Sequence, residues 1–107
     1  MAKYLLQGAY SIEGHKGLLK SGGSQRREAI TKVVQSIGGR LETFYWTFGS
    51  DDYILIVEVP DNITAAALGL TVAASGGVHG LRTTVLLTAE EVDRATKVSV
   101  PYRPPGQ

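Results

Sequence analysis

Six side chains of this sequence are the candidates for binding a ligand, because their types exchange protons or form directed hydrogen bonds: His15, Lys16, Tyr45, Thr47, Glu58 and Arg82. His15 lies in a glycine-rich segment, and histidine is the side chain whose charge changes most readily near neutral pH. We therefore expect His15, rather than His79 at the start of a predicted strand, to take part in acid–base chemistry or to close the mouth of a pocket.

The polar residues Tyr45, Thr47 and Glu58 share one face of a predicted β-hairpin, and we expect Arg82 on the last predicted strand to share it. A buried polar group without a partner costs about 1–3 kcal/mol. These side chains should therefore either pair with one another, with Arg82 to Glu58 as the most favourable pair, or line a wet cavity. The second alternative is a ligand site in which the Tyr45 hydroxyl forms the main hydrogen bond.

Other kinds of site lack their usual residues. His15 and His79 have no carboxylate at a metal-ligand spacing on the same element, so no metal site is predicted. Asp51 and Asp52 are neighbours on a turn, where side chains diverge and bind nearby amides instead of acting as a catalytic pair. The chain has neither a cysteine nucleophile nor a strand–turn–helix nucleophile elbow, and no P-loop or dinucleotide-binding motif.

A segment rich in glycine precedes the first long predicted helix. It is either a surface loop with solvated charges or a site that binds an anion. The free amides and the dipole at a helix start favour an anion. The basic residues near that start are Lys16, Lys20, Arg26 and Arg27.

The composition indicates one small domain of 107 residues, with no cysteine and therefore no disulfide. Lys and Arg number 11 and Asp and Glu number 10, and a net charge of +1 is not the basic balance of a nucleic-acid or membrane-binding surface. No apolar run approaches the roughly 18 residues that span a bilayer, and strand-like alternation follows Met1 instead of a signal-peptide core. We expect a cytoplasmic protein that binds neither nucleic acid nor membrane and needs no cofactor.

The rest of the chain is organised around residues 40–60, which read as a β-hairpin about a Gly-Ser-Asp-Asp turn. With Ser50 and Asp51 as a two-residue loop, Phe48 faces Tyr53 and Trp46 faces Leu55. This register makes one face wholly apolar, whereas a slip by one residue mixes both faces. We therefore expect Phe44, Trp46 and Phe48 in the core, although a three-residue loop with a bulge stays open.

The other predicted elements follow from hydrophobic period and capping residues. They are a strand over 3–10 that is buried on both faces, a loop over 11–23 with at most one helical turn, a helix over 24–37, a helix over 63–75, a strand over 78–87, a short helix from 88 to about 98, and an extended tail over 99–107. The first helix has its apolar stripe at Ile30, Val33, Val34 and Ile37, and we place Arg26 elsewhere on its surface. The second helix is apolar almost all round, which predicts a buried helix.

The first long helix is expected to begin at a Ser24 cap and to end at Gly38, in the left-handed conformation that glycine favours. Thr88 and Glu91 predict a capping box that opens the last helix, with Val92 and Ala95 facing inward.

This order of elements predicts an α+β fold, a ferredoxin-like βαββαβ sandwich followed by a helix and a tail. Both main helices should cover one sheet face. The other face would then expose more apolar surface than a monomer usually tolerates, so we expect a homodimer formed through that face.

A series of residues and short motifs runs over nearly the whole length of the sequence: Tyr10, Gly14-x-x-Gly17-Leu18, Gly22-Gly23, Arg26, Gly38-Gly39, the run from Phe44 to Gly49, Asp52, Pro60-Asp61, the Ala-Ser-Gly at 74–76, and Leu87-Thr88. In this order they resemble the GYD domain family. In the Gly-x-Tyr-Asp-like turn of the family, Gly49 and Asp52 match and Asp51 takes the place of the tyrosine. The resemblance implies one domain with its core over about 3–98, similar in architecture to dimeric α+β barrel proteins such as antibiotic-biosynthesis monooxygenases and muconolactone isomerases. It implies no catalytic residues.

Two functions are compatible with these observations. The first is a small-ligand-binding or accessory module that works as a homodimeric α+β barrel. The second is a cofactor-independent oxygenase or isomerase acting on a small aromatic or lactone-like substrate, which rests on analogy of fold alone. The two differ in whether groups that move protons, such as His15, Tyr45 and Arg82, meet in one cavity.

Overall fold

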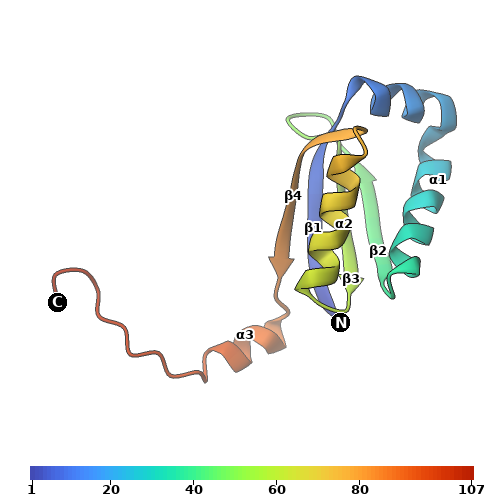
Figure 1. Cartoon of the computed structure of the whole chain (residues 1–107). Coiled ribbons are helices and arrows are strands. Elements are labelled where there is room, and N and C mark those ends of the chain that lie inside the picture. Colours follow the sequence, from blue (N-terminus) through green and yellow to red (C-terminus); the bar gives the residue numbers. More distant parts are fainter.

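The computed structural model describes all 107 residues and has the expected order of strands and helices. The elements are β1 (Ala2–Tyr10), α1 (Ile12–Ser36), β2 (Arg40–Trp46), β3 (Tyr53–Val59), α2 (Asn62–Ala74), β4 (Val78–Leu86) and α3 (Ala89–Ala95). The four strands form one antiparallel sheet in the order β2-β3-β1-β4 (Figure 1). The predicted α+β class is therefore confirmed. None of the three helices has the length and apolar character needed to cross a bilayer.

The two faces of the sheet differ because side chains alternate along each strand. On β1 every second residue from Tyr4 to Tyr10 is buried, and on β3 the buried positions run from Tyr53 to Val59 in the same way. Val34 of α1 and Leu68 of α2 belong to the same buried cluster as these strand residues. Both long helices therefore cover one face of the sheet, as predicted.

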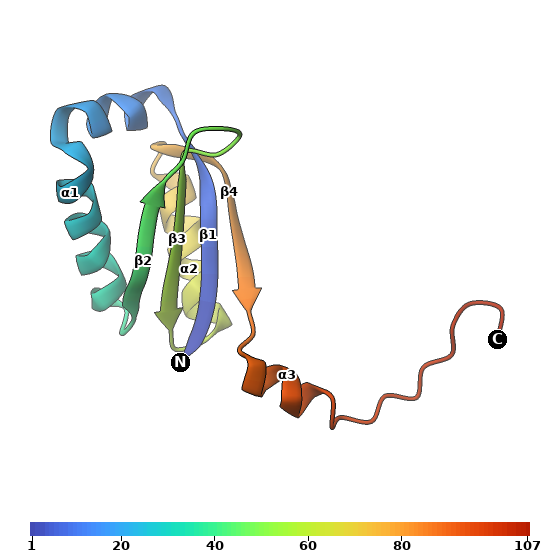
Figure 2. The same cartoon turned by 180° about the vertical axis from the view of Figure 1, so that it is seen from behind.

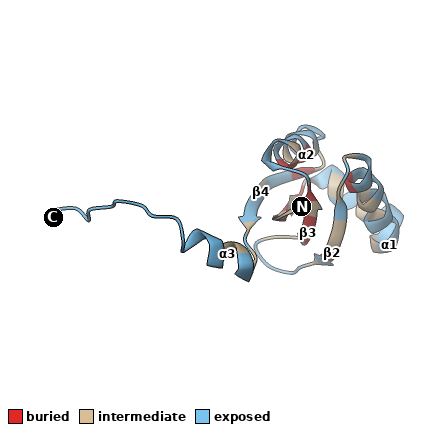
Figure 3. Ribbon diagram, turned by 90° about the horizontal axis from the view of Figure 1, so that it is seen from below, coloured by how far each residue is buried: buried red, intermediate tan, exposed pale blue.

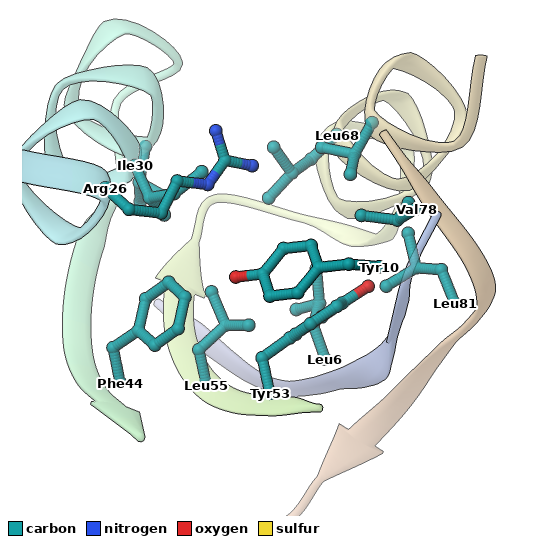
Figure 4. Close-up of a pocket in the computed structure, with 12 residues that line it drawn as sticks. Leu6, Tyr10, Arg26, Ile30, Phe44, Tyr53, Leu55, Leu68, Val78 and Leu81 are labelled. Carbon is teal, nitrogen blue, oxygen red and sulfur yellow. The ribbon is translucent and has the colours of Figure 1, made fainter. Parts of the chain in front are cut away.

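The two helices lie over opposite edges of that face, with a gap between them. Figure 3 shows α2 over β4 and the middle of the sheet, and α1 beside β2, with the buried residues between them. The sheet curves around this space, so that β2 and β4 rise on either side of β1 and β3 (Figure 4). Residues of both helices and of the sheet line a cavity in this gap, which is therefore a cleft between the helices.

Helix α1 starts much earlier than the sequence predicted, which makes the expected loop over 11–23 wrong. Ser11, not Ser24, caps it, and the Ser11 hydroxyl accepts a hydrogen bond from the Gly14 amide at 3.1 Å. The helix bends at Gly22, whose φ of +80° and ψ of 171° are open to glycine and not to other residues. Its first half runs across the end of the sheet, and its second half descends along β2 (Figure 1).

The hairpin pairs in a different register from the one predicted. Trp46 faces Tyr53 and Phe44 faces Leu55, which is a shift of two residues. Because the shift is even, Phe44 and Trp46 keep to the helix-covered face, and the predicted sorting of the two faces is right. Phe48 instead belongs to a longer loop and is fully exposed, so its predicted place in the core is wrong.

Helix α2 is buried along one side only, which contradicts the prediction of a wholly buried helix. Ala65 and Leu68 face the sheet, whereas Ile63 and Leu70 are exposed. The Asp61 carboxylate caps the helix by accepting a hydrogen bond from the Thr64 amide at 2.8 Å. The hydrogen bonds from Thr64 favour the charged carboxylate and hold the pKa of Asp61 below its usual value.

Residues 88–107 form an arm that leads away from the sheet (Figures 1 and 2). The predicted capping box is present, because the Thr88 hydroxyl accepts from the Glu91 amide at 3.1 Å and the Glu91 carboxylate accepts from the Thr88 amide at 2.9 Å. Val92 and Ala95 are exposed, so the prediction of an inward face for this helix is wrong.

The second face of the sheet is not covered by either long helix (Figure 2). Leu5 and Ile56 face each other near its centre, with Ile54 and Leu86 on the same side, and all four are half-buried. Ion pairs between Lys3 and Glu42 and between Arg40 and Glu58 lie at one end of the face. The result is an apolar centre with a charged border.

Candidate functional site

The cleft between α1 and α2 contains an apolar inner cavity of about 30 Å³ (Figure 4). Of the 12 residues that line it, 11 are hydrophobic. Ile30 and Val34 contribute from α1, Leu68 and Val72 from α2, and the sheet forms the floor. The polar atoms in this lining are few, and they decide what the cavity can bind.

Arg26 is the one charged residue of the inner cavity. It lies four residues before Ile30, so the helical period brings its side chain to the apolar stripe that faces the cleft. The prediction that Arg26 lies elsewhere on the helix is therefore wrong. Its Nε is buried without a hydrogen-bond partner, and no carboxylate forms an ion pair with its guanidinium. An arginine in this state is an unused donor.

Tyr53 brings a second unused donor to the same cavity. Its side chain is only 4% exposed, and its hydroxyl is buried without a partner. The hydroxyl lies over Gly8, where a Cβ would be 2.7 Å from the oxygen, so the lack of a side chain at that position makes room for the ring. Burial raises the pKa of Tyr53 to about 12. The hydroxyl therefore keeps its proton and can donate it to an acceptor.

Tyr10 lies between these two groups and is held by its neighbours. The indole Nε1 of Trp46 donates to the Tyr10 hydroxyl at 3.1 Å, and the rings of Tyr10 and Tyr53 are 5.1 Å apart. Because that hydroxyl accepts from Trp46, its own proton stays free to be donated. Figure 4 shows the Tyr10 hydroxyl and the Tyr53 hydroxyl directed to opposite sides of the cavity, with the Arg26 guanidinium above them.

His15 and Asp52 form a pair at the edge of the cleft. The Asp52 carboxylate accepts a hydrogen bond from the Tyr10 amide at 2.9 Å and lies 3.4 Å from Nε2 of His15. Nδ1 of His15 is 3.0 Å from the Ser11 carbonyl oxygen, and the ring meets that of Tyr10 edge-on at 5.7 Å. Both ring nitrogens of His15 thus face oxygen acceptors, and only the protonated ring donates to both. The pair connects the start of α1 to the hairpin loop.

A larger outer cavity of about 400 Å³ adjoins the inner one and shares Tyr10 and Arg26 with it. Residues from both halves of α1 and from the turn after α2 form its walls. Three glycines and three uncharged polar residues line it: Gly14, Gly17, Gly77, Ser21, Gln25 and Ser75. Gly14 permits a close approach, because a Cβ there would lie 2.1 Å from the Gly77 carbonyl oxygen. Together the cavities form one cleft with an apolar floor and a polar mouth.

Of the six residues predicted as a site, only His15 lies beside this cleft. Lys16 is exposed on the first half of α1. The Thr47 hydroxyl donates to the Asp51 carbonyl oxygen at 2.7 Å within the hairpin loop. Tyr45 is 66% exposed on the uncovered face, as its predicted face requires.

The predicted pair of Arg82 with Glu58 is wrong. Glu58 binds Arg40, which lowers the pKa of the Glu58 carboxyl, and Arg82 donates to the Asp51 carboxylate at 2.8 Å. Arg82 and Glu58 are on the same face but at different ends of the strands. The six residues do not meet in one cavity, and their role in ligand binding stays a prediction.

Sequence reasoning missed the three residues that do meet at the cleft: Tyr10, Arg26 and Tyr53. A signal was present for Arg26, which precedes Ile30 and Val33 by four and seven positions and so continues their stripe. A charged residue in an apolar stripe is a candidate for a buried function. No signal marked the two tyrosines apart from other core aromatics.

No group of three or more His, Asp or Glu side chains is placed to hold a metal ion. The unpaired groups of the cleft are instead hydrogen-bond donors, and donors attract an acceptor atom of a ligand, not a cation.

The architecture so described is an α+β protein with a four-stranded antiparallel sheet, two helices on one face, and a cleft between those helices. The model of the GYD domain matches residues 4–96, which is most of the chain. The protein therefore belongs to the GYD domain family, as its sequence motifs indicated. No curated protein and no solved structure matches the chain.

Proposed function

We propose that this protein is a small-ligand-binding module that works as a homodimer, and that the ligand occupies the cleft between α1 and α2. The observation that carries the proposal is the presence of two buried, unpaired donors, Arg26 Nε and the Tyr53 hydroxyl, in a cavity that is otherwise apolar. Each such donor costs about 1–3 kcal/mol in the free protein. A ligand that supplies an acceptor recovers that free energy on binding.

Ordered water is the other means of satisfying these donors. A cavity of about 30 Å³ has room for roughly one or two water molecules. The adjoining outer cavity of about 400 Å³ has a size in the range of small-molecule sites. The combination supports a ligand in the outer cavity that reaches Arg26.

The homodimer is proposed from the uncovered face of the sheet. Leu5 and Ile56 at its centre and the ion pairs at its border resemble the apolar core and polar rim of a protein interface. The arm over 88–107 adds apolar side chains without a partner in the same chain, among them Val98 and Tyr102. In this proposal the fold is ferredoxin-like and two sheets pack face to face as a dimeric α+β barrel. We also propose a cytoplasmic location, because a chain without cysteine suits a reducing compartment.

The second candidate is a cofactor-independent oxygenase or isomerase acting on a small aromatic or lactone-like substrate. One observation favours it: the pair of His15 and Asp52 places a side chain that exchanges protons next to Tyr10 at the edge of the cleft. In this case the same cleft holds the substrate, and His15 moves a proton at its mouth.

The proposal is tested by a thermal-melting screen of a broad library of small molecules against the purified protein. Ligands of the cleft should raise the melting temperature of the wild-type chain but not that of the double variant that carries both Tyr53→Phe and Arg26→Met. If no compound of the library stabilises the wild-type chain, the proposed function is refuted. A stabilising compound is then incubated with the protein in air, and the mixture is separated by liquid chromatography and analysed by mass spectrometry, because an isomerase product has the same mass as its substrate and differs only in retention time. A compound unchanged in both mass and retention time supports the module, and a product that disappears in His15→Gln supports the enzyme.

The homodimer has its own measurement, which is light scattering at micromolar concentration. A dimer mass is expected for the wild-type chain, and Ile56→Asp, at the centre of the uncovered face, should give a folded monomer. A wild-type monomer mass would refute this part of the proposal.

A further inference from the structure

The position of Arg26 restricts the chemistry of the ligand. Arg26 and Tyr10 are shared by the inner and the outer cavity, so they lie where the two meet. The guanidinium is directed into the space between the helices, on the same side as the Tyr10 hydroxyl (Figure 4). A group placed at this junction contacts both donors and is still reached from the outer cavity.

The charge around this junction is not balanced within the chain. Arg26 is the only charged residue among those that line either cavity, and no Asp or Glu is present in either lining. Two other arginines do have a carboxylate partner: Arg40 pairs with Glu58, and Arg82 pairs with Asp51. Arg26 is therefore a guanidinium in a partly apolar cleft without a counter-charge, and burying such a charge unpaired is costly.

We propose that the cleft takes a small organic acid with a single carboxylate, which accepts hydrogen bonds from Arg26 and from the Tyr10 hydroxyl. This inference rests on the proposed function and names the ligand class for the same site. The compact body of the acid fills the outer cavity, where Ser21, Gln25 and Ser75 offer partners for a hydroxyl or carbonyl substituent. The apolar lining of the inner cavity closes the other side of the carboxylate from water.

Two other ligand classes fit the cleft less well. A neutral ligand leaves the guanidinium without a counter-charge. A phosphorylated ligand or a diacid brings about two negative charges, and a site with one arginine and apolar walls leaves one of them buried and unpaired. A monocarboxylate matches both the number of charges and the fork of donors that a guanidinium presents.

The chain contains one tryptophan, and this residue reports on the site. Trp46 Nε1 binds the Tyr10 hydroxyl, so a carboxylate at that hydroxyl changes the surroundings of the indole. Titrations that follow Trp46 fluorescence use four probes: benzoate, its neutral analogue benzamide, 4-hydroxybenzoate and the dianion phenyl phosphate. Each probe is titrated against the wild type, Arg26→Met and Arg27→Met. Arg27 is the matched control, because it is the next residue of α1 and is exposed.

The proposal expects saturable binding of at least one of the two benzoates, with benzamide and phenyl phosphate at least tenfold weaker. Arg26→Met should lose at least tenfold in affinity for the acid and Arg27→Met less than twofold. If the Arg26 variant does not fold, the ¹⁵Nε resonance of Arg26 in the wild-type protein serves instead and should shift on adding the acid and not on adding benzamide.

The outcomes separate this inference from the function on which it rests. Equal binding of benzoate and benzamide, or acid binding that Arg26→Met does not weaken, overturns the carboxylate assignment and leaves a ligand-binding cleft. If neither acid binds while neutral compounds from the melting screen do, the carboxylate assignment is likewise overturned and the ligand-binding cleft remains. If no compound binds, whether anionic or neutral, the cleft holds only water and both proposals are refuted.

Discussion

Replacing Tyr53 by phenylalanine should stabilise the free protein, which is the reverse of what the loss of a buried tyrosine hydroxyl usually does. The hydroxyl is buried without a partner, and such a group costs about 1–3 kcal/mol. Phenylalanine keeps the ring, its contact with Tyr10 and its place over Gly8. We therefore expect the free energy of unfolding to rise by about 1 kcal/mol or more.

Tyr4 provides the matched control. Its side chain is 1% exposed, but its hydroxyl donates to the Asn62 side-chain oxygen. Removing a hydroxyl that has a partner costs about 0.5–1.5 kcal/mol, and it leaves the Asn62 oxygen without that donor. Removing the hydroxyl from these two buried tyrosines of one sheet is thus expected to change the free energy of unfolding in opposite directions.

The assay is thermal and urea unfolding of the wild type, Tyr53→Phe and Tyr4→Phe at equal protein concentration and without added ligand. For 107 residues, an unfolding entropy of roughly 2.1 cal/mol/K per residue means that 1 kcal/mol moves the midpoint by about 4 °C. Tyr53→Phe should melt at least that much higher and Tyr4→Phe lower. If Tyr53→Phe is destabilised as much as Tyr4→Phe, the Tyr53 hydroxyl has a bound partner, and the reasoning about an unmet donor is wrong.

Three further predictions use other features of the chain. Because burial raises the pKa of Tyr53 from 10.0 to about 12, the folded chain keeps a proton that the unfolded chain loses. The free energy of unfolding should therefore fall between about pH 10 and 12, and the fall should be smaller in Tyr53→Phe, as urea titrations across that range would show. Gly39→Ala should lower the free energy of unfolding by about 1–3 kcal/mol, because its Cβ would lie 2.4 Å from a backbone carbonyl oxygen. Gly17→Ala has open space and should raise the free energy of unfolding by up to about 1 kcal/mol. Equal effects of the two substitutions in chemical denaturation would contradict this prediction. Asp52→Ala removes the acceptor of the Tyr10 amide and should lower stability by about 1–3 kcal/mol, against no change for the exposed Asp93→Ala; a neutral Asp52→Ala melt would show that the contact is not needed.

Much of the fold could be predicted because local signals agreed with the final packing. The alternation along β1 and β3 fixed which residues face the helices, and that sorting survived the error in the hairpin register. The Thr88 capping box began its helix as expected. These features depend on residues close in sequence, and such residues are what a sequence pattern reports.

The errors came from contacts between distant segments. Four glycines in 11–23 argued for a loop, since each weakens a helix by up to about 1 kcal/mol. The Ser11 cap and the packing of Gly14 against Gly77 favour the helix instead, and the second contact is between residues far apart in the chain. A tertiary contact of this kind leaves no local pattern.

The hairpin register changed for a similar reason. With a two-residue turn at Ser50 and Asp51, Asp52 would pair with the opposite strand of the hairpin. In the structure its backbone amide donates to the Gly8 carbonyl oxygen at 2.8 Å, and its carboxylate accepts from the Tyr10 amide. Asp52 is thus bound to β1, and the loop before it is longer. The cleft was missed on the same ground, because Tyr10, Arg26 and Tyr53 come from three elements whose approach only the fold determines.

The bend in α1 has a consequence for how the cleft can be adjusted. The half of the helix before Gly22 forms one wall of the outer cavity, and the half after it is packed on β2 and adds Gln25, Arg26 and Ala29 to the lining. Gly22 itself lines neither cavity, and a side chain there would meet nothing within 4 Å. The angle between the two halves of α1 is therefore set by the φ and ψ torsions of Gly22, a residue that does not touch the ligand. Any other amino acid at this position fits sterically but resists the φ of +80°, so it would turn the wall and alter the width of the cleft while every lining residue stays the same.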